Sequence, residues 1–168
     1  MFLVKTAKVR SYEKGLYFRD REFQGILDQG RYWFVDPLFK VKVDVVSQRT
    51  PWIEHKDLDV IVKSGALEGH ATVVDLKDNQ RALVWVDGRF EKVLGPGLYA
   101  LWTNVRDVRV EMIDARKVRF EHADINLIAK SANVEKDLNI STVEPGFAGV
   151  YFKDGTYVET LGPGQYMF

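Results

Sequence analysis

Apolar and polar residues alternate along several stretches of the chain. In residues 40–45, valines alternate with lysine and aspartate, and in residues 108–113 the alternation recurs with valine and methionine against arginine and glutamate. A period of two with one charged face is typical of a half-buried β-strand. Residues 117–122 continue the alternation. The pattern therefore predicts a chain built mainly from β-strands.

The strand pattern recurs with a period of 67 residues. The segment GLYFRDREFQGILDQGRYWF from Gly15 aligns without a gap with ALVWVDGRFEKVLGPGLYAL from Ala82, and with GVYFKDGTYVETLGPGQYMF from Gly149. Between residues 15–81 and 82–148, 16 of 67 positions are identical, where chance would give about 4 for an ordinary composition. The predicted fold class is mainly β, with tandem small antiparallel β-repeat units and one or two short helices.

This period divides the chain into four segments. A lead strand in residues 1–14 precedes β-repeat 1 in residues 15–81 and β-repeat 2 in residues 82–148, and residues 149–168 begin a third copy. The third copy stops before its second half, so we expect the chain to be a fragment of a longer protein rather than a capped array.

Two kinds of turn recur in the copies. An Asp-Gly pair follows the first strand, and glycine there accepts the positive φ that a two-residue hairpin requires. A Gly-Pro-Gly follows the second strand and predicts a type II turn. In the first copy Arg21 replaces the hairpin glycine, which predicts a looser turn. The predicted turn residues are Asp87, Gly88, Gly95, Pro96, Gly97, Asp154, Gly155, Gly162, Pro163, Gly164 and Gly30.

Two equivalent segments predict short helices. DLDVIVKSG begins at Asp57 and DINLIAKSA begins at Asp124, and each aspartate is expected to be the N-cap of its helix. Residues 133–138 predict a further helical turn.

Composition excludes several classes of function. The 168 residues carry 24 Lys and Arg against 24 Asp and Glu, which argues against a nucleic-acid binder that neutralises phosphates. Without cysteine the chain has no disulfide, thiolate nucleophile or Cys-based zinc site. No apolar run approaches the roughly 20 residues of a membrane-spanning helix, and the N-terminus is no signal peptide. We expect a cytoplasmic protein, peripheral to a membrane only through regions outside this chain.

The residues that could catalyse a reaction or bind a metal are better explained by structural roles. His55 and His122 are repeat equivalents, each preceded by Glu and followed two residues later by Asp, and the favoured role is to satisfy a turn or a neighbouring carbonyl rather than to bind a metal. No serine lies in a GxSxG elbow, and no glycine-rich loop cradles a phosphate. We therefore predict no catalytic residue, no metal site and no cofactor.

Aromatic and basic side chains leave two alternatives open. The aromatic positions repeat, which favours core packing over base stacking; they are Phe18, Trp85 and Phe152, and Phe23, Phe90 and Tyr157. The lead segment is basic, which fits a solvated edge strand or contact with an anionic membrane surface; its cations are Lys5, Lys8, Arg10 and Lys14.

The motif GVYFKDGTYVETLGPGQY resembles the opening hairpin of band-7 (SPFH) domains, the superfamily of stomatin, prohibitin and flotillin. The matching residues are Gly146, Gly149, Gly155, Leu161, Pro163 and Gly164, and the second copy adds the strand VRVEMIDAR with Asp114 and Arg116. The chain as a whole is similar to the N-terminal part of bacterial slipins, and more distantly to the β-repeats of the major vault protein.

This resemblance implies a non-enzymatic scaffold that forms homo-oligomers and organises unidentified partner proteins. Two other functions stay open. An adaptor would bind an extended segment by adding it as a strand to a sheet edge. A hydrolase without known motifs would show a deep pocket lined by Asp or His residues that break the repeat.

Overall fold

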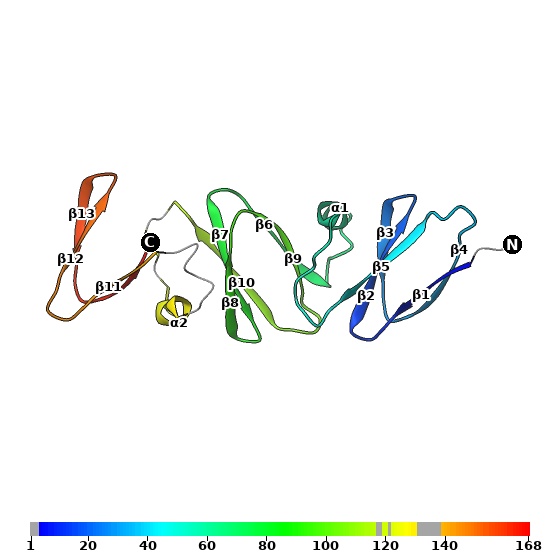
Figure 1. The fold of residues 1–168 in the computed structure, drawn as a ribbon, viewed down its shortest axis with the longest axis horizontal. Coiled ribbons are helices and arrows are strands. Elements are labelled where there is room, and N and C mark those ends of the chain that lie inside the picture. Colours follow the sequence, from blue (N-terminus) through cyan, green and yellow to red (C-terminus); the bar gives the residue numbers. More distant parts are fainter. Residues whose placement is uncertain (1–3, 117–118, 121, 131–138) are drawn as a thin grey trace. The chain divides into compact units, whose positions relative to one another are not determined.

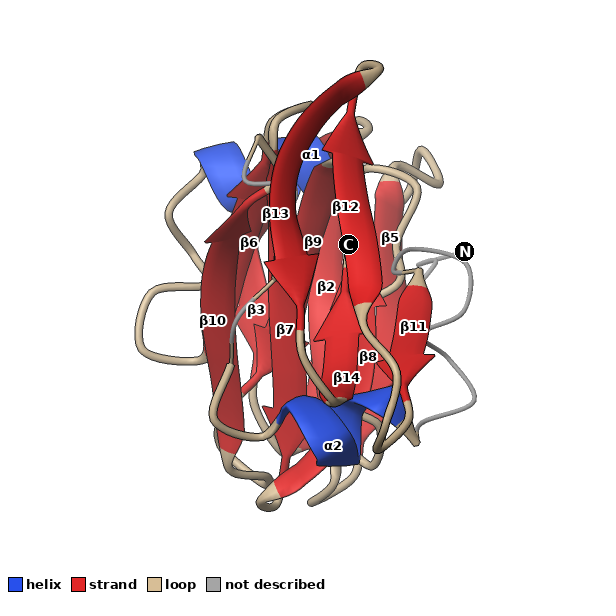
Figure 2. Cartoon of the chain, turned by 90° about the vertical axis from the view of Figure 1, so that its left-hand side faces the viewer, coloured by secondary structure: helices blue, strands red, loops and turns tan. Residues whose placement is uncertain are grey.

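The computed structural model describes residues 4–116, 119–120, 122–130 and 139–168, and these are folded mainly into antiparallel β-strands with two short helices (Figure 2). The mainly β class with tandem antiparallel units is therefore confirmed. The first set of elements is β1 (Val4–Val9), β2 (Glu13–Arg19), β3 (Glu22–Leu27), β4 (Gly30–Val35), β5 (Val41–Ser47) and α1 (Leu58–Lys63).

The same order of elements recurs 67 residues later, and its first four strands recur once more. The second set is β6 (Ala71–Leu76), β7 (Gln80–Val86), β8 (Arg89–Leu94), β9 (Gly97–Trp102), β10 (Val108–Asp114) and α2 (Ile125–Ala129). The third set is β11 (Ile140–Val143), β12 (Gly149–Lys153), β13 (Thr156–Leu161) and β14 (Gly164–Met167). We call these sets the first, second and third repeat. Strand β1 has counterparts in β6 and β11, so the lead segment also follows the period.

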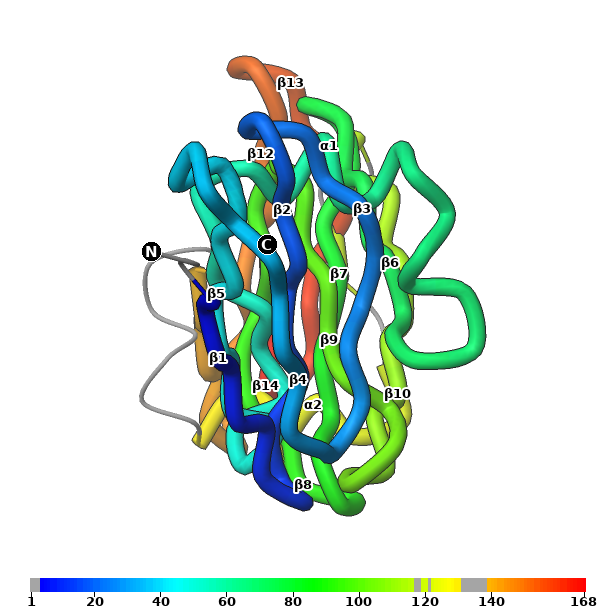
Figure 3. The backbone as a smooth tube through the Cα atoms, turned by 90° about the vertical axis from the view of Figure 1, so that its right-hand side faces the viewer, coloured from blue at the N-terminus to red at the C-terminus, as the bar shows by residue number. Residues whose placement is uncertain are grey.

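Each repeat pairs its strands in the same way (Figure 1). The first strand pairs with the fourth, as in β1–β4, which run side by side in Figure 3, in β6–β9 and in β11–β14. The second and third strands form a hairpin, and the fifth joins its other side to give the sheets β3-β2-β5 and β8-β7-β10. The hairpin register is also the same, since β2–β3 shifts at Tyr17/Phe18 and β12–β13 shifts at Tyr151/Phe152.

The chain divides into two compact units. The first contains Met1–Asp75, Val86–Gly88 and Gly97–Arg109, and the second contains Leu76–Trp85, Arg89–Pro96 and Val110–Phe168. Each unit therefore combines strands from two consecutive repeats.

The core of the first unit lies where the second repeat covers the first. Strands β2, β3 and β5 and helix α1 supply most of it, and Ala100 and Trp102 of β9 complete it. The contact is fixed by the backbone, because Ile53 N–H donates to the carbonyl of Ala100 at 2.9 Å. The buried members are Leu16, Phe18, Ile53, Ile61, Leu67, Ala100 and Trp102.

The core of the second unit is built from equivalent positions. Its buried members are Leu83, Trp85, Val93, Phe120, Ile128 and Met167. Phe120 N–H donates to the carbonyl of Met167 at 2.9 Å. This bond is the equivalent, 67 positions later, of the bond from Ile53 to Ala100. We call this arrangement, in which the two-stranded sheet of one repeat closes the core of the preceding repeat, the junction.

Both helices begin where the sequence predicts them. Asp57 and Asp124 stand at the N-cap positions, but neither side chain accepts a capping hydrogen bond. The helical turn expected in residues 133–138 lies outside the described residues. Within the described part of the chain, neither helix has the length and apolar character needed to cross a bilayer.

Candidate functional site

The hairpin turns place two consecutive residues at positive φ. Asp87 and Gly88 have φ of +51° and +73°, and Asp154 and Gly155 have +51° and +77°. In the first repeat the prediction of a looser turn is wrong. Arg21 takes a φ of +69° after Asp20 at +55°, and the β2–β3 register closes on Arg19 and Glu22 as in the third repeat. All three are two-residue hairpins with the torsions of a type I′ turn.

The Gly-Pro-Gly segments join the hairpin to the next strand as a bend. Gly97 and Gly164 have φ of +149° and +158°, far from the roughly +80° of a type II turn, so that assignment is wrong. The glycine is needed because a tyrosine ring covers it, and a Cβ on Gly97 would lie 3.3 Å from the Tyr99 hydroxyl. In the third repeat the tyrosine hydroxyl also donates to the turn, from Tyr166 to the Gly162 carbonyl at 2.9 Å.

Gly30 occupies the same bend in the first repeat. Its φ is not positive, but the ring of Tyr32 lies 3.4 Å from where its Cβ would be. The Tyr32 hydroxyl donates to the Asp28 carbonyl at 2.9 Å. The turn residues that the sequence marks thus lie at strand ends, where their backbone and the adjacent tyrosine shape the connection.

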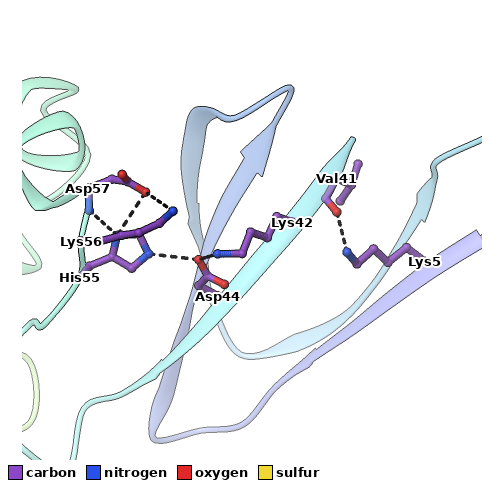
Figure 4. A network of polar contacts seen from close by, with 7 residues as sticks. All are labelled: Lys5, Val41, Lys42, Asp44, His55, Lys56 and Asp57. Carbon is purple, nitrogen blue, oxygen red and sulfur yellow. Dashed lines mark hydrogen bonds and ion pairs between the residues drawn. The ribbon is translucent and has the colours of Figure 1, made fainter. Parts of the chain in front are cut away.

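His55 links the start of α1 to the sheet (Figure 4). Its Nδ1 accepts the backbone N–H of Asp57 at 3.1 Å, and its Nε2 lies 3.1 Å from an oxygen of Asp44. Since Nδ1 is an acceptor, the neutral ring carries its proton on Nε2 and donates it to the carboxylate. The ring stacks on Phe18 at 5.4 Å. The helix therefore begins with a histidine, rather than an aspartate, as the acceptor of its free N–H.

His122 repeats this arrangement in the second unit. Its Nδ1 accepts the N–H of Asp124 at 2.9 Å, its Nε2 lies 3.3 Å from Glu111, and the ring stacks on Trp85 at 5.5 Å. Both histidines are thus used structurally. Among the described residues, no group of three or more His, Asp and Glu side chains is placed to hold a metal ion.

The contacts of Asp44 with Lys42 and His55 change the pKa of its carboxyl group. Partial burial raises its pKa, but hydrogen bonds from Lys42 and His55 outweigh that effect and hold the pKa below its usual value. The Lys42 ammonium lies 2.5 Å from Asp44. The negative charge that anchors His55 is therefore maintained well into the acid range.

A pocket of about 530 Å³ lies in the first unit, and each aspartate in its lining is paired with a lysine of the lining. Lys40 contacts Asp20 at 2.5 Å, and Lys56 lies 3.8 Å from Asp57. Both aspartates have repeat equivalents, so the pocket lacks the repeat-breaking acids expected of a hidden hydrolase. The lining residues are Phe18, Asp20, Arg21, Phe39, Lys40, Val41, Lys42, Lys56 and Asp57.

Basic residues of the lead segment are also engaged within the first unit. Lys5 donates to the Val41 carbonyl at 2.6 Å, and Lys14 pairs with Asp28. The Lys14 ammonium lowers the pKa of the Asp28 carboxyl through a hydrogen bond and through charge attraction. These contacts of Lys5 and Lys14 stabilise strand connections.

One face of the β1–β4 sheet exposes large apolar side chains, and we call it the head face. Val4, Trp33 and Val35 share it, because Val4 lies opposite Val35 and Thr6 lies opposite Trp33. Their exposed fractions are 49 to 66%. On the opposite side of the sheet, Phe34 stacks on Tyr17 at 4.9 Å. The head face is therefore the outer side of a sheet that is packed on its inner side.

One face of the β12–β13 hairpin exposes a second apolar set, which we call the tail face. It consists of Val150, Phe152 and Tyr157, which are 55 to 58% exposed. The rings of Phe152 and Tyr157 meet edge to face at 6.1 Å. The prediction of core packing is therefore wrong for these two aromatics, while Phe18 and Trp85 are buried as predicted.

The tail face differs in exposure from the same hairpin face in the first two repeats. In the first two repeats the same hairpin face is covered by the segment that follows the fifth strand and by the helix. Sequence reasoning missed both faces, because each apolar residue in them is equivalent to a residue that packs into a core elsewhere in the chain, and this equivalence predicts burial.

No protein-family model, curated protein or solved structure matches this chain. The resemblance to band-7 hairpins consequently stays a prediction.

Proposed function

We propose that the chain is a non-enzymatic assembly module that associates with itself. The single observation that carries this proposal is the junction: the chain makes it twice, and it also exposes two apolar faces whose repeat equivalents pack into a junction. An apolar face that is a core element in equivalent repeats is suited to burial against a partner.

The free energies of apolar burial and of association indicate how strong this self-association is. Burying a large apolar side chain contributes roughly 1.5–3 kcal/mol, and the six side chains of the two faces are about half exposed, so their full burial contributes roughly 5–9 kcal/mol in total. Loss of translational and rotational freedom costs about 4–15 kcal/mol. We therefore expect reversible association that is populated at high protein concentration.

Sedimentation velocity from micromolar to millimolar concentration tests the proposal. The expected result is a weight-average mass that rises with concentration above the 19.3 kDa of one chain. A constant monomeric mass across the whole range would contradict it.

The edges of the sheets favour a second candidate function. Strands β3 and β5 are the outer strands of the sheet β3-β2-β5, and an outer strand offers backbone donors and acceptors to an added segment. A protein that stays monomeric and protects the amides of β3 or β5 from hydrogen exchange when an extended peptide is added would be an adaptor instead.

The band-7 resemblance adds a biological setting to the proposal. If the chain is the N-terminal arm of a slipin-like protein, its self-association serves to build a larger homo-oligomer that organises partner proteins. The mass measurement does not depend on this setting.

A further inference from the structure

We infer that the pocket of the first unit binds a small organic phosphate that carries a flat ring, which is the chemistry of a mononucleotide. This inference goes beyond the proposed self-association and does not depend on it. It rests on the construction of the pocket, on the lining residues that the second repeat does not share, and on the charge of the lining.

The pocket has the size of a small-molecule site. Its volume is about 530 Å³, and such sites usually occupy about 300–1,000 Å³. Three segments of the first unit line it, namely the end of β2 with its hairpin turn, residues 39–42, and residues 56–57 before α1. The first two segments are joined by the backbone, because Asp20 N–H donates to the Lys40 carbonyl at 3.0 Å.

The loop that carries Phe39 and Lys40 is held in place by a buried carboxylate. Asp36 is 5% exposed, and its two carboxylate oxygens accept the N–H groups of Lys40 at 2.7 Å and Val41 at 3.0 Å. The Lys5 ammonium also donates to the Val41 carbonyl (Figure 4). A lining that is ordered before the ligand arrives loses little conformational entropy on binding.

Backbone strain is concentrated in this lining. Three of the five non-glycine residues that adopt positive φ in the described part of the chain line the pocket, and they are Asp20 at +55°, Arg21 at +69° and Phe39 at +55°. Positive φ is unfavourable for a bulky side chain, and strained conformations cluster at ligand sites. Phe39 is 74% exposed, so apolar burial does not account for its strain. Its ring can instead stack on a flat ring of a ligand.

The lining contains side chains that the repeat architecture does not require. Residues required by the fold recur 67 positions later, as Asp20 and Asp57 do. Four other lining residues change in charge or chemical type. The correspondence is Arg21 with Gly88, Phe39 with Arg106, Lys40 with Asp107, and Lys56 with Ala123. A ligand bound only by the first repeat would account for these differences.

The lining has a net positive charge. Its four cations and two carboxylates leave an excess of two positive charges, and these residues are Arg21, Lys40, Lys42, Lys56, Asp20 and Asp57. The equivalent positions of the second repeat carry two cations and three carboxylates, which are Arg106, Arg109, Asp87, Asp107 and Asp124. A phosphate monoester carries a charge of about −1.5 to −2 at pH 7. The charge of the first-repeat lining complements that of a phosphate monoester.

Arg21 is the cation best suited to hold the phosphate. Its side chain makes no hydrogen bond or ion pair with the residues that the structure describes, whereas Lys40 contacts Asp20 and Lys42 contacts Asp44. A guanidinium can bind two phosphate oxygens at once. The phosphate would therefore bind at the hairpin turn, and the ring of the ligand would stack on Phe39.

Titration calorimetry with three probes tests the chemistry of the ligand. AMP carries both groups, inorganic phosphate carries the anion alone, and adenosine carries the ring alone. We expect AMP to bind about tenfold more tightly than either of the other two, with an affinity that falls as salt is added. If inorganic phosphate or adenosine binds as tightly as AMP, one of the two contacts is absent and the inference is wrong. The inference is also wrong if AMP shows no saturable binding up to millimolar concentration.

Two variants assign the contacts to residues. Arg21→Gly removes the cation and relieves the strain of positive φ, so the fold should be at least as stable, which thermal unfolding would verify. This variant should weaken the binding of AMP and of inorganic phosphate alike, by about tenfold. Phe39→Ala should weaken AMP by about tenfold and leave inorganic phosphate unchanged. If either variant binds AMP as the unmodified chain does, the inference fails.

Arg89→Gln is the matched control for lost charge. Arg89 is exposed at the start of β8, next to the hairpin turn of the second repeat, and it does not line the pocket. The inference requires this variant to bind AMP as the unmodified chain does. A loss equal to that of Arg21→Gly would mean that net charge, rather than the pocket, controls binding.

Phosphotyrosine is a fourth probe, because it combines a phosphate with a ring on a protein side chain. AMP should bind more tightly, since its larger purine ring offers more area for stacking on Phe39. Tighter binding of phosphotyrosine would indicate a modified protein segment as the occupant and would overturn the assignment to a small molecule.

Discussion

At the scale of single residues, the first and second repeats are each organised around an inward-facing histidine. His55 satisfies the first free N–H of α1, anchors to a strand carboxylate and stacks on a core ring. An aspartate stands at the N-cap, yet its side chain accepts no capping bond. Replacing the histidine would leave a helix donor without its acceptor and an aromatic face without its partner.

Truncation of His55 tests this role. His55→Ala is expected to lower the free energy of unfolding by about 1–3 kcal/mol, because a largely buried donor and acceptor lose their partners. His70→Ala is the control, since His70 has no repeat equivalent and its ring contacts an exposed Asn104; its cost should stay within about 0.5 kcal/mol. Urea unfolding measures both, and equal midpoints would contradict the structural role of His55.

The lowered pKa of Asp44 gives the stability a defined dependence on pH. A carboxyl whose folded pKa is depressed contributes stability that is fully present above its unfolded pKa of 3.8 and is lost as pH falls through the lower folded pKa. Asp44→Asn should therefore be less stable than the unmodified chain at neutral pH, by about 1 kcal/mol or less. The difference should shrink below pH 4. Urea unfolding at several pH values measures it, and a difference independent of pH would exclude this charge as the cause.

At the scale of elements, the connections of each repeat are set by backbone torsions at a few positions. Gly97 combines a φ of +149° with a tyrosine ring against its α-carbon, whereas Gly95 has open space around it and no positive φ. Position 97 therefore requires glycine because of both its backbone torsion and the nearby ring. Neither condition applies at position 95.

Valine scanning of this bend separates the two glycines. Gly97→Val is expected to cost about 1–3 kcal/mol through backbone strain, which lowers the melting temperature of a chain of this size by several degrees. Gly95→Val should be close to neutral. Differential scanning calorimetry measures both, and a larger loss for Gly95→Val would mean that the bend is not what selects glycine.

The sequence predicts the strands and turns well because these depend on local patterns. It does not reveal that Arg21 adopts a positive φ. The free energy gained by pairing the two strands outweighs the backbone strain of a non-glycine residue in that conformation. Nor does it show that β1 belongs to the repeat. Residues 4–9 and 71–76 have no identical position, and the shared pairing with the fourth strand depends on backbone hydrogen bonds that any sequence can make.

Exposure of the candidate faces was beyond local reasoning for a different reason. Phe152 has the same sequence context as Phe18 and Trp85, so the pattern around it predicts burial. In the first repeat its counterpart Phe18 is covered by a segment more than thirty residues away in sequence. Burial is a property of the junction and not of the strand.

At the scale of the whole molecule, stability belongs to pairs of repeats. The core of the first unit includes Ala100 and Trp102, which lie in the second repeat, and the core of the second includes Met167 of the third. Such arrays are described by interface terms between neighbours in addition to the stability of each repeat.

Removal of one residue of the second repeat should therefore weaken elements of the first. Trp102→Ala is expected to cost about 3–5 kcal/mol and to speed amide hydrogen exchange in β2 and α1, with little change in β12 and β13. Val35→Ala, at the equivalent but exposed position, is the matched control and should leave exchange of the monomer unchanged. Uniformly faster exchange in both units after Trp102→Ala would indicate a single cooperative molecule instead.

The constancy of the hairpin register has a consequence for how such a chain can change in length. Because the strands pair in the same order in successive repeats, and the first and third hairpins share the same bulge, duplicating one period would add a complete junction. An insertion of one residue within a strand would instead turn the following side chains to the other side of the sheet. Lengthening by whole periods would therefore preserve the strand pairing of the existing repeats.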